Sequence, residues 1–215
     1  MEYRHITPED LKDVLELQIL VYENLENKEV LETIEAEEFI EMIEQGFIIG
    51  MFKGEELKAV RAMYIPPVDD PEHLASDGGV EQREEVIYSE ITFIHPDARG
   101  QGLQTKLGRE LIKKVRDDGR FNYVFTTVMP TNLPSLKDKL RLGFKIVNTR
   151  YMYGGKLRHV LQLNLRHQLK GTGEPQKINY NDTKWMLEHG SDHIGDNLED
   201  SQIDYYLKGG SIDEY

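Results

Sequence analysis

A glycine-rich turn between an apolar strand and an amphipathic helix is the feature that most constrains this chain. Residues 86–94 (VIYSEITFI) are typical of a strand, and RGQG follows at residues 99–102. Apolar side chains then recur at helical spacing through residues 103–115. N–H groups at a helix start are unpaired and carry partial positive charge, and glycines let an anion approach them closely. The pattern predicts a strand–turn–helix unit suited to a phosphate group.

Two better-known phosphate loops are excluded by their spacing. The chain has no GxxxxGK[ST] run, which nucleoside triphosphatases of the P-loop type require. It also has no GxGxxG that opens a repeated strand–helix–strand pattern, as dinucleotide-binding folds do. The turn is therefore either a phosphate site of another kind or a plain tight turn.

The rest of the pattern predicts an α/β (α+β) fold with a mixed, mostly antiparallel central sheet flanked by helices. Thr7 is the expected N-cap of the first helix, Pro8 its first residue and Gly46 the C-cap of the second helix. The strands and helices given next are expected to form a first domain of residues 1–168. Strands are expected at residues 2–7, 47–52, 57–65, 86–94, 123–129 and, as a hairpin, 144–165; helices are expected at 7–22, 29–45, 103–118 and 133–143.

Two segments stand apart from this pattern. Residues 68–85 contain proline, paired glycines and many acidic residues, so they are expected to form a long loop, either a functional lid or a tolerated insertion. Residues 169–215 form an acidic C-terminal extension. Its apolar clusters at residues 185–187 and 203–207 are unusual for a disordered tail. The extension is expected to dock on its own domain or on a partner subunit, as in a homodimer; the alternative is a solvated acidic tail.

Composition excludes several classes of function. The net charge of −13, from 26 basic and 39 acidic residues, argues against a nucleic-acid partner and fits a cationic one weakly, since solubility alone also explains it. The chain has no cysteine and thus no disulfide or thiolate nucleophile. No His, Asp and Glu spacing indicates a metal site. Without a membrane-length apolar run or a secretory signal, a cytoplasmic location is expected.

Residues 86–115 resemble the acetyl-CoA-binding core of the GCN5-related N-acetyltransferases, the GNAT superfamily. In that family a strand ending in V-x-P precedes [RQ]-x-x-G-x-[GA] at the start of a helix. Residues 94–96 (IHP) and 99–104 (RGQGLQ) take these places here. The later Asn132 and Gly143-Phe144 match a further family feature, an Asn after the next strand and a Gly-Phe after a short helix. RGQGLQ together with YGGKLRHVL is similar to a bacterial subgroup with unassigned substrates.

The resemblance implies acetyl-CoA as co-substrate, with its diphosphate on the amides of the turn and its pantetheine arm along the preceding strand. Arg99 is expected beside the diphosphate, with a surface ion pair as the alternative. Gln104 stands where the family usually has Gly or Ala, and its amide is expected to add a donor. For Asn132 and Ser135 the alternative is helix capping. The implied cofactor-binding residues are Phe93, Ile94, Arg99, Gly100, Gln101, Gly102, Leu103, Gln104, Asn132 and Ser135.

Glu90 is the predicted general base, because an ammonium must lose a proton before it attacks a thioester. It lies on the cofactor-lining strand, where family members often carry His or Glu. Strand alternation is expected to place Glu90, Thr92 and Ile94 on one face. The alternative is a buried structural carboxylate paired with an arginine such as Arg61.

The general acid is less well marked. Family members often have a tyrosine seven residues after the Asn, and here that position is Lys139, whose ammonium is expected at most to stabilise a thiolate. Tyr151 is the substitute acid, without positional support. A half-buried strand tyrosine is the simpler account of Tyr151.

These features predict an acetyl-CoA-dependent N-acetyltransferase, an acyltransferase that works by direct transfer without a metal. Its acceptor is a primary amine of a small molecule or of a protein, and the acidic composition leans toward a cationic one. The alternative is a catalytically weak acyl-CoA-binding sensor or interaction module that works through the C-terminal extension.

Overall fold

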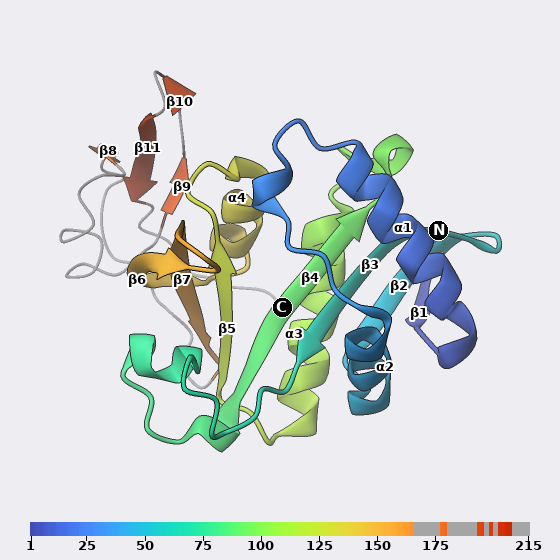
Figure 1. Ribbon diagram of the computed structural model, residues 1–215, viewed down its shortest axis with the longest axis horizontal. Coiled ribbons are helices and arrows are strands. Elements are labelled where there is room, and N and C mark those ends of the chain that lie inside the picture. The colour runs from blue at the N-terminus through green and yellow to red at the C-terminus, as the bar shows by residue number, and fades with distance from the viewer. Residues whose placement is uncertain (166–176, 180–192, 196–197, 200–201, 208–215) are drawn as a thin grey trace. The chain divides into compact units, whose positions relative to one another are not determined.

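The computed structural model of the chain describes residues 1–165, 177–179, 193–195, 198–199 and 202–207 (Figure 1). They belong to two compact units, which are described separately. The first contains Met1–Ile65 and Ile87–Arg120, and the second contains Pro66–Val86 and the chain from Phe121 onward. Antiparallel strand pairs accompanied by helices build both units, so the predicted α/β fold with a mostly antiparallel sheet is confirmed.

The first unit is a four-stranded antiparallel sheet with helices on both faces. Its strands follow in the order β1 (Glu2–His5), β2 (Ile48–Lys53), β3 (Glu56–Tyr64) and β4 (Val86–Ile94). Helices α1 (Leu11–Glu23) and α2 (Ala36–Gln45) cover one face, and α3 (Leu103–Asp118) covers the other (Figure 1). The core under α1 and α2 consists of buried apolar side chains: Ile6, Val14, Leu17, Val21, Ile34, Phe39, Met42, Ile48, Phe52, Leu57, Val60, Ala62, Ile91 and Phe93.

A carboxylate fixes the start of the first helix. The 3-10 turn η1 (Pro8–Asp10) leads into α1, with Thr7 as its N-cap, as expected. The Asp10 carboxylate accepts hydrogen bonds from the Thr7 N–H (2.9 Å), the Thr7 hydroxyl (3.0 Å) and both terminal nitrogens of Arg4 (2.7 Å each). The hydrogen bonds from Arg4 and then those from Thr7 hold the pKa of Asp10 at about 2, below its usual 3.8.

Asp10→Asn is expected to lower the free energy of unfolding at pH 7 by about 2 kcal/mol, since one pKa unit is worth about 1.4 kcal/mol. The folded-state pKa lies below the unfolded one, so this contribution is complete above about pH 4 and is lost as the pH falls through about 2. Urea unfolding of both proteins from pH 7 to pH 3 checks it. The exposed Asp13→Asn is the control, and an Asp10→Asn deficit that does not shrink in acid contradicts the account.

The second helix is shorter than the sequence pattern predicts. α2 begins at Ala36, whereas the prediction placed the start at Glu29; a 3-10 turn, η2 (Lys28–Val30), occupies the first part instead. The buried Gln18 side chain donates to the Ile34 carbonyl (2.9 Å) and accepts from the Ile34 N–H (2.8 Å). Because these bonds use both backbone groups of Ile34, the segment before α2 stays extended.

Between residues 121 and 165, the second unit contains three antiparallel strands and one helix. The strands follow in the order β5 (Tyr123–Val128), β7 (Lys156–Asn164) and β6 (Lys145–Met152), and the helix is α4 (Leu133–Arg141). The expected loop at residues 68–85 belongs to this unit and contains two 3-10 turns, η3 (Leu74–Gly78) and η4 (Arg83–Glu85). Leu74 and Ala75 are buried, so this segment contributes to the core.

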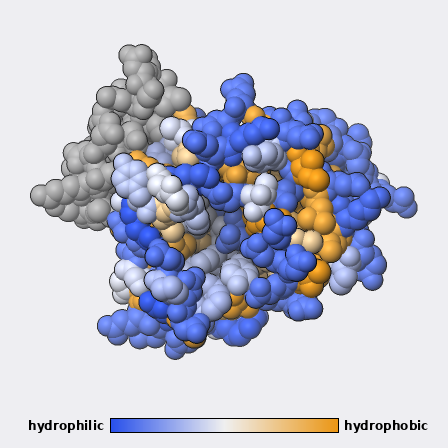
Figure 2. Space-filling model, in the orientation of Figure 1, coloured by the Kyte–Doolittle hydropathy of each residue, from blue (hydrophilic) through white to orange (hydrophobic). Residues whose placement is uncertain are grey.

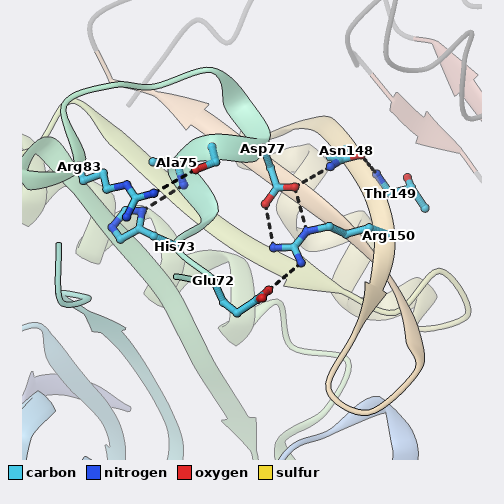
Figure 3. A network of polar contacts seen from close by, with 9 residues as sticks. Glu72, His73, Ala75, Asp77, Arg83, Asn148, Thr149 and Arg150 are labelled. Carbon is cyan, nitrogen blue, oxygen red and sulfur yellow. Dashed lines mark hydrogen bonds and ion pairs between the residues drawn. The ribbon is translucent and has the colours of Figure 1, made fainter. Parts of the chain in front are cut away.

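A polar network fastens this segment to β6 (Figure 3). The Asp77 carboxylate accepts from Arg150 Nε (2.9 Å) and Nη2 (3.1 Å) and also from the Asn148 side chain. Arg150 Nη1 donates to Glu72 (2.9 Å). Arg83 closes the segment on itself through the carbonyls of residues 68 and 70 (3.0 Å each). Residues 68–85 are therefore attached to β6, and to one another, by several side-chain hydrogen bonds. The choice between a lid and a tolerated insertion stays a prediction.

Gly78→Ala is expected to destabilise the protein by about 1–3 kcal/mol through overpacking. A Cβ there would lie 2.7 Å from Phe125 Cζ and 2.9 Å from Phe125 Cε1, and that ring is fully buried. Thermal and urea unfolding measure the loss. Phe125→Leu in the same chain is expected to relieve part of it, and equal costs in both backgrounds would show that the ring is not the obstacle.

The C-terminal extension is described only in short strands. β11 (Gln202–Leu207) pairs antiparallel with β8 (Lys177–Asn179), β9 (His193–Gly195) and β10 (Leu198–Glu199). The predicted apolar cluster at 203–207 therefore lies on a strand, and the cluster at 185–187 lies outside the described residues. Docking of the extension stays a prediction.

Figure 2 shows a mostly hydrophilic face on which hydrophobic side chains gather over α1. Ile19 of α1 and Ile40 of α2 are among the exposed large hydrophobic residues. Within the described part of the chain, every helix is too short or too polar to cross a membrane.

Candidate functional site

The glycine-rich turn adopts the conformation that its sequence predicts. After β4 a 3-10 turn, η5 (Pro96–Ala98), leads to Arg99, and α3 then begins at Leu103. Gly100 (φ 75°) and Gly102 (φ 71°) both lie in the left-handed region, which side chains with a Cβ enter at a cost. A Cβ at either position would meet no protein atom within 4 Å. The glycines are therefore required by backbone geometry, and they leave open space in front of the turn.

The start of α3 is left available to an external anion. Its N-cap, Gly102, has no side chain that can accept from the first-turn N–H groups, and its first turn contains no acidic residue. By contrast, α2 carries Glu37 and Glu38 in its first turn. Arg99 and residues 100–102 are exposed. Because first-turn amides have no acceptor within the helix, an anion in this open space would receive several hydrogen bonds.

One group of potential metal ligands lies beside this turn. Among the described residues, Glu56, His95 and Asp97 bring three ligand atoms within 4.8 Å of one another. The Lys58 ammonium already donates to Glu56 and to Asp97 (2.8 Å). A protein cation therefore occupies this position, and the expectation of a metal-free site stays a prediction.

Glu90 lies at an irregularity of β4. Ala62 of β3 pairs with Ile91 and the next residue, Met63, pairs with Ser89, so Glu90 has no Cα partner on β3. Across this β-bulge, burial still alternates along the strand: Glu90, Thr92 and Ile94 are less buried than Ile91 and Phe93, as expected for residues that share one face. Bulges re-aim side chains and are frequent beside active sites. Glu90 is exposed, which corrects the alternative of a buried structural carboxylate.

Carboxylates surround the tyrosine next to this bulge. Burial raises the pKa of Tyr64 first, followed by the charge of Glu41 and a hydrogen bond with Glu41, and then by the charges of Glu90 and Glu38. Helix α2 supplies two of these carboxylates and the bulge supplies the third. The first unit thus concentrates negative charge around Tyr64 and Glu90.

The remaining predicted site residues belong to the second unit. Asn132 caps α4, because its side-chain oxygen accepts from the Ser135 N–H (3.2 Å), so the capping alternative is observed. Lys139 is only 4% exposed, and its ammonium lies 5.7 Å from the centre of the Phe144 ring. Tyr151 is 71% exposed on β6. Their roles toward a cofactor stay predictions.

Two buried cations of β3 were missed as site residues. Lys58 contacts the segment before the turn, and Arg61 donates to the backbone carbonyl of Gln104 (2.8 Å). The available signal was a lysine and an arginine inside an otherwise apolar strand, LKAVRAMYI. Charged residues are almost never fully buried unless they are paired, so such positions indicate specific contacts.

Comparisons with known proteins agree with this geometry. Residues 11–144 match the family model described as the acetyltransferase (GNAT) family. No curated protein matches the chain.

Solved structures show the same fold at low sequence identity. The yncA protein of Salmonella typhimurium, solved with its cofactor acetyl-CoA, is 16% identical, with a TM-score of 0.59 over 81% of this chain and 99% of that one. A ribosomal-protein-alanine N-acetyltransferase from Brucella melitensis is 20% identical, with a TM-score of 0.58 over 76% and 99%. A polyamine N-acetyltransferase from Drosophila melanogaster is 14% identical, with a TM-score of 0.57 over 76% and 99%.

Proposed function

The chain belongs to the acetyltransferase (GNAT) family, and from this premise we propose that it transfers the acetyl group of acetyl-CoA directly to a primary amine. The observation that carries the proposal is the turn at residues 99–104. Two left-handed glycines precede a helix whose first amides have no acidic or N-cap side chain, and the space in front of them is open. A diphosphate matches this arrangement in charge and in its number of acceptor oxygens.

The cofactor is proposed to bind through the main chain more than through side chains. The Phe93 side chain is fully buried against Phe39, with ring centres 6.3 Å apart, so at this position only the backbone is offered to pantetheine. The exposed Arg99 is proposed to lie beside the diphosphate. Asn132 and Ser135 are proposed to contact the cofactor in addition to capping α4.

Glu90 is proposed to remove a proton from the acceptor ammonium, directly or through a water. The free amine then attacks the thioester carbonyl and a C–N bond forms. The C–S bond breaks, the nitrogen loses its second proton to give the amide, and the departing CoA thiolate takes up one proton. A thiol with a pKa of about 8.5 is a good leaving group, so this step depends least on a dedicated acid. The burial of Lys139 and the exposure of Tyr151 agree with a weak role for either residue.

The carboxylates around Glu90 favour an acceptor that is positively charged when it arrives. The charges of Glu38, Glu41 and Glu90 all act on the Tyr64 hydroxyl, so an amine arriving there enters a negative field. The acceptor is proposed to be a small cationic amine or a protein amino group.

Titration of the full-length chain with acetyl-CoA, followed by thiol release with a panel of amines, tests the proposal. Saturable binding together with amine-dependent thiol release is expected. Binding without turnover on any amine would favour the alternative, an acyl-CoA-binding sensor. The sequence observation behind this alternative is that Lys139 stands where the family often has a tyrosine. No binding would overturn both.

A further inference from the structure

Strand β3 holds the diphosphate-binding turn at both ends with two buried cations. We propose that Lys58 and Arg61 are positioning residues for the cofactor diphosphate: they fix the segment 97–104 in its binding shape before the ligand arrives. This inference rests on the proposed function. Lys58 acts on the turn through the Asp97 carboxylate, and Arg61 acts on it through the backbone carbonyl of Gln104.

Arg61 fixes the helical end of the segment. Its side chain is 0% exposed under α3. Nη1 donates to the Gln104 carbonyl (2.8 Å), which lies in the first turn of α3, and Nη2 donates to the Ser89 hydroxyl of β4 (3.2 Å). One guanidinium thereby joins three elements, and its planar fork fixes direction as well as distance. The carbonyl that it binds belongs to the last residue of the predicted diphosphate-binding set.

Lys58 fixes the strand end of the segment. The residue is 5% exposed, and its ammonium donates to Asp97 (2.8 Å) and to Glu56. A backbone hydrogen bond joins the same two segments, because the Lys58 carbonyl accepts from the His95 N–H (2.9 Å). Hydrogen bonds to Asp97 and then to Glu56 raise the pKa of Lys58, so it stays charged at neutral pH.

The geometry around Asp97 explains why a lysine is used at this position. Asp97 Oδ1 lies 2.6 Å from His95 Nδ1 while its other oxygen binds Lys58. Without the ammonium, two carboxylates and an imidazole would gather close to the place proposed for a diphosphate, and like charge would oppose the ligand. Lys58 therefore both ties down η5 and neutralises charge at the entrance to the turn.

The consequence is an affinity that depends on preorganisation. A turn already held in shape loses little conformational freedom when a ligand binds. Loss of either tie is expected to weaken ligands that contain the diphosphate and to leave the pantetheine contacts almost unchanged.

The test measures the affinity of four variants for three probes. Lys58→Met and Arg61→Met remove the ties, and Lys58→Arg and Arg61→Lys retain the charge. The probes are acetyl-CoA, inorganic pyrophosphate, and S-acetylpantetheine, which lacks the diphosphate. Lys53→Met, the same change at an exposed position of β2, is the control, and circular dichroism and thermal unfolding monitor the fold.

The expected result is a rise of about 10-fold in Kd for acetyl-CoA and pyrophosphate in each Met variant, from the loss of a charge-assisted contact. S-acetylpantetheine is expected to change by less than about twofold, and Lys58→Arg is expected to recover most of the loss. Equal weakening of all three probes, or unchanged Kd in folded Lys58→Met, would overturn the inference. Wild-type protein that binds pyrophosphate but not acetyl-CoA would refute the proposed function alone; wild-type protein that binds neither refutes both.

Discussion

Glu90→Gln is expected to lower kcat for acetyl transfer by about 100-fold or more, the size typical for the loss of a general base. Glutamine keeps the shape of the side chain at the β4 bulge but cannot take a proton from the acceptor ammonium. Acetyl-CoA affinity is expected to stay within about twofold, because the turn that holds the diphosphate is unchanged. Steady-state rates of thiol release, measured alongside acetyl-CoA titrations, separate the two effects.

The pH dependence of this variant distinguishes a base from a residue that only shapes the site. An alkylammonium has a pKa near 10, so the fraction of free amine rises as the pH approaches that value. The deficit of Glu90→Gln in kcat/KM is therefore expected to shrink between pH 7 and pH 9.5. Glu16→Gln, the same change on an exposed face of α1, is the control and is expected to behave as wild type. A deficit that is equal at all pH values would contradict the role as a base.

Gly102→Val is expected to raise the Kd for acetyl-CoA by about 10- to 100-fold, which corresponds to the loss of one or two hydrogen bonds to a charged group. Gly102 lies at φ 71° and is the N-cap of α3, so a β-branched residue strains the turn and moves the first amides. The new side chain would meet no protein atom within 4 Å of its Cβ, so it would extend into the space proposed for the diphosphate.

Gly119→Val provides a matched control at the other end of the same helix. Gly119 caps the C-terminus of α3 at φ 78°, and a Cβ there also meets no atom within 4 Å. The two variants are expected to lose similar stability, about 1–2 kcal/mol from left-handed strain. Only Gly102→Val is expected to lose acetyl-CoA affinity. Equal affinities in the two variants would show that the turn at residues 99–104 does not bind the cofactor.

The glycine turn was predictable from sequence because its requirement is local. Gly100 and Gly102 must be glycines for conformational reasons, and the adjoining apolar periodicity marks the strand and the helix. Gly46 and Gly119 likewise end α2 and α3 in the left-handed conformation. Local chemistry of this kind marks the ends of α2 and α3 and the start of α3.

Features that depend on distant partners were not predictable in this way. The late start of α2 follows from Gln18, which uses the backbone of Ile34 across sixteen positions of sequence. The bulge at Glu90 appears only when β4 is paired with β3. The roles of Lys58 and Arg61 likewise depend on which backbone and carboxylate groups the fold brings beside them. Sequence spacing carries no direct record of such long-range contacts.

The measurement that tests the central claim most directly is a single-turnover reaction with acetyl-CoA that carries a deuterated acetyl group. The full-length chain is mixed with labelled acetyl-CoA and a panel of small cationic amines, and mass spectrometry follows the label in the amine, in CoA and on the protein. The account predicts that the label passes to an amine nitrogen at a rate that Glu90→Gln lowers, without a labelled protein intermediate. Label that stays in acetyl-CoA although the cofactor is bound, or that accumulates on the protein, would contradict it.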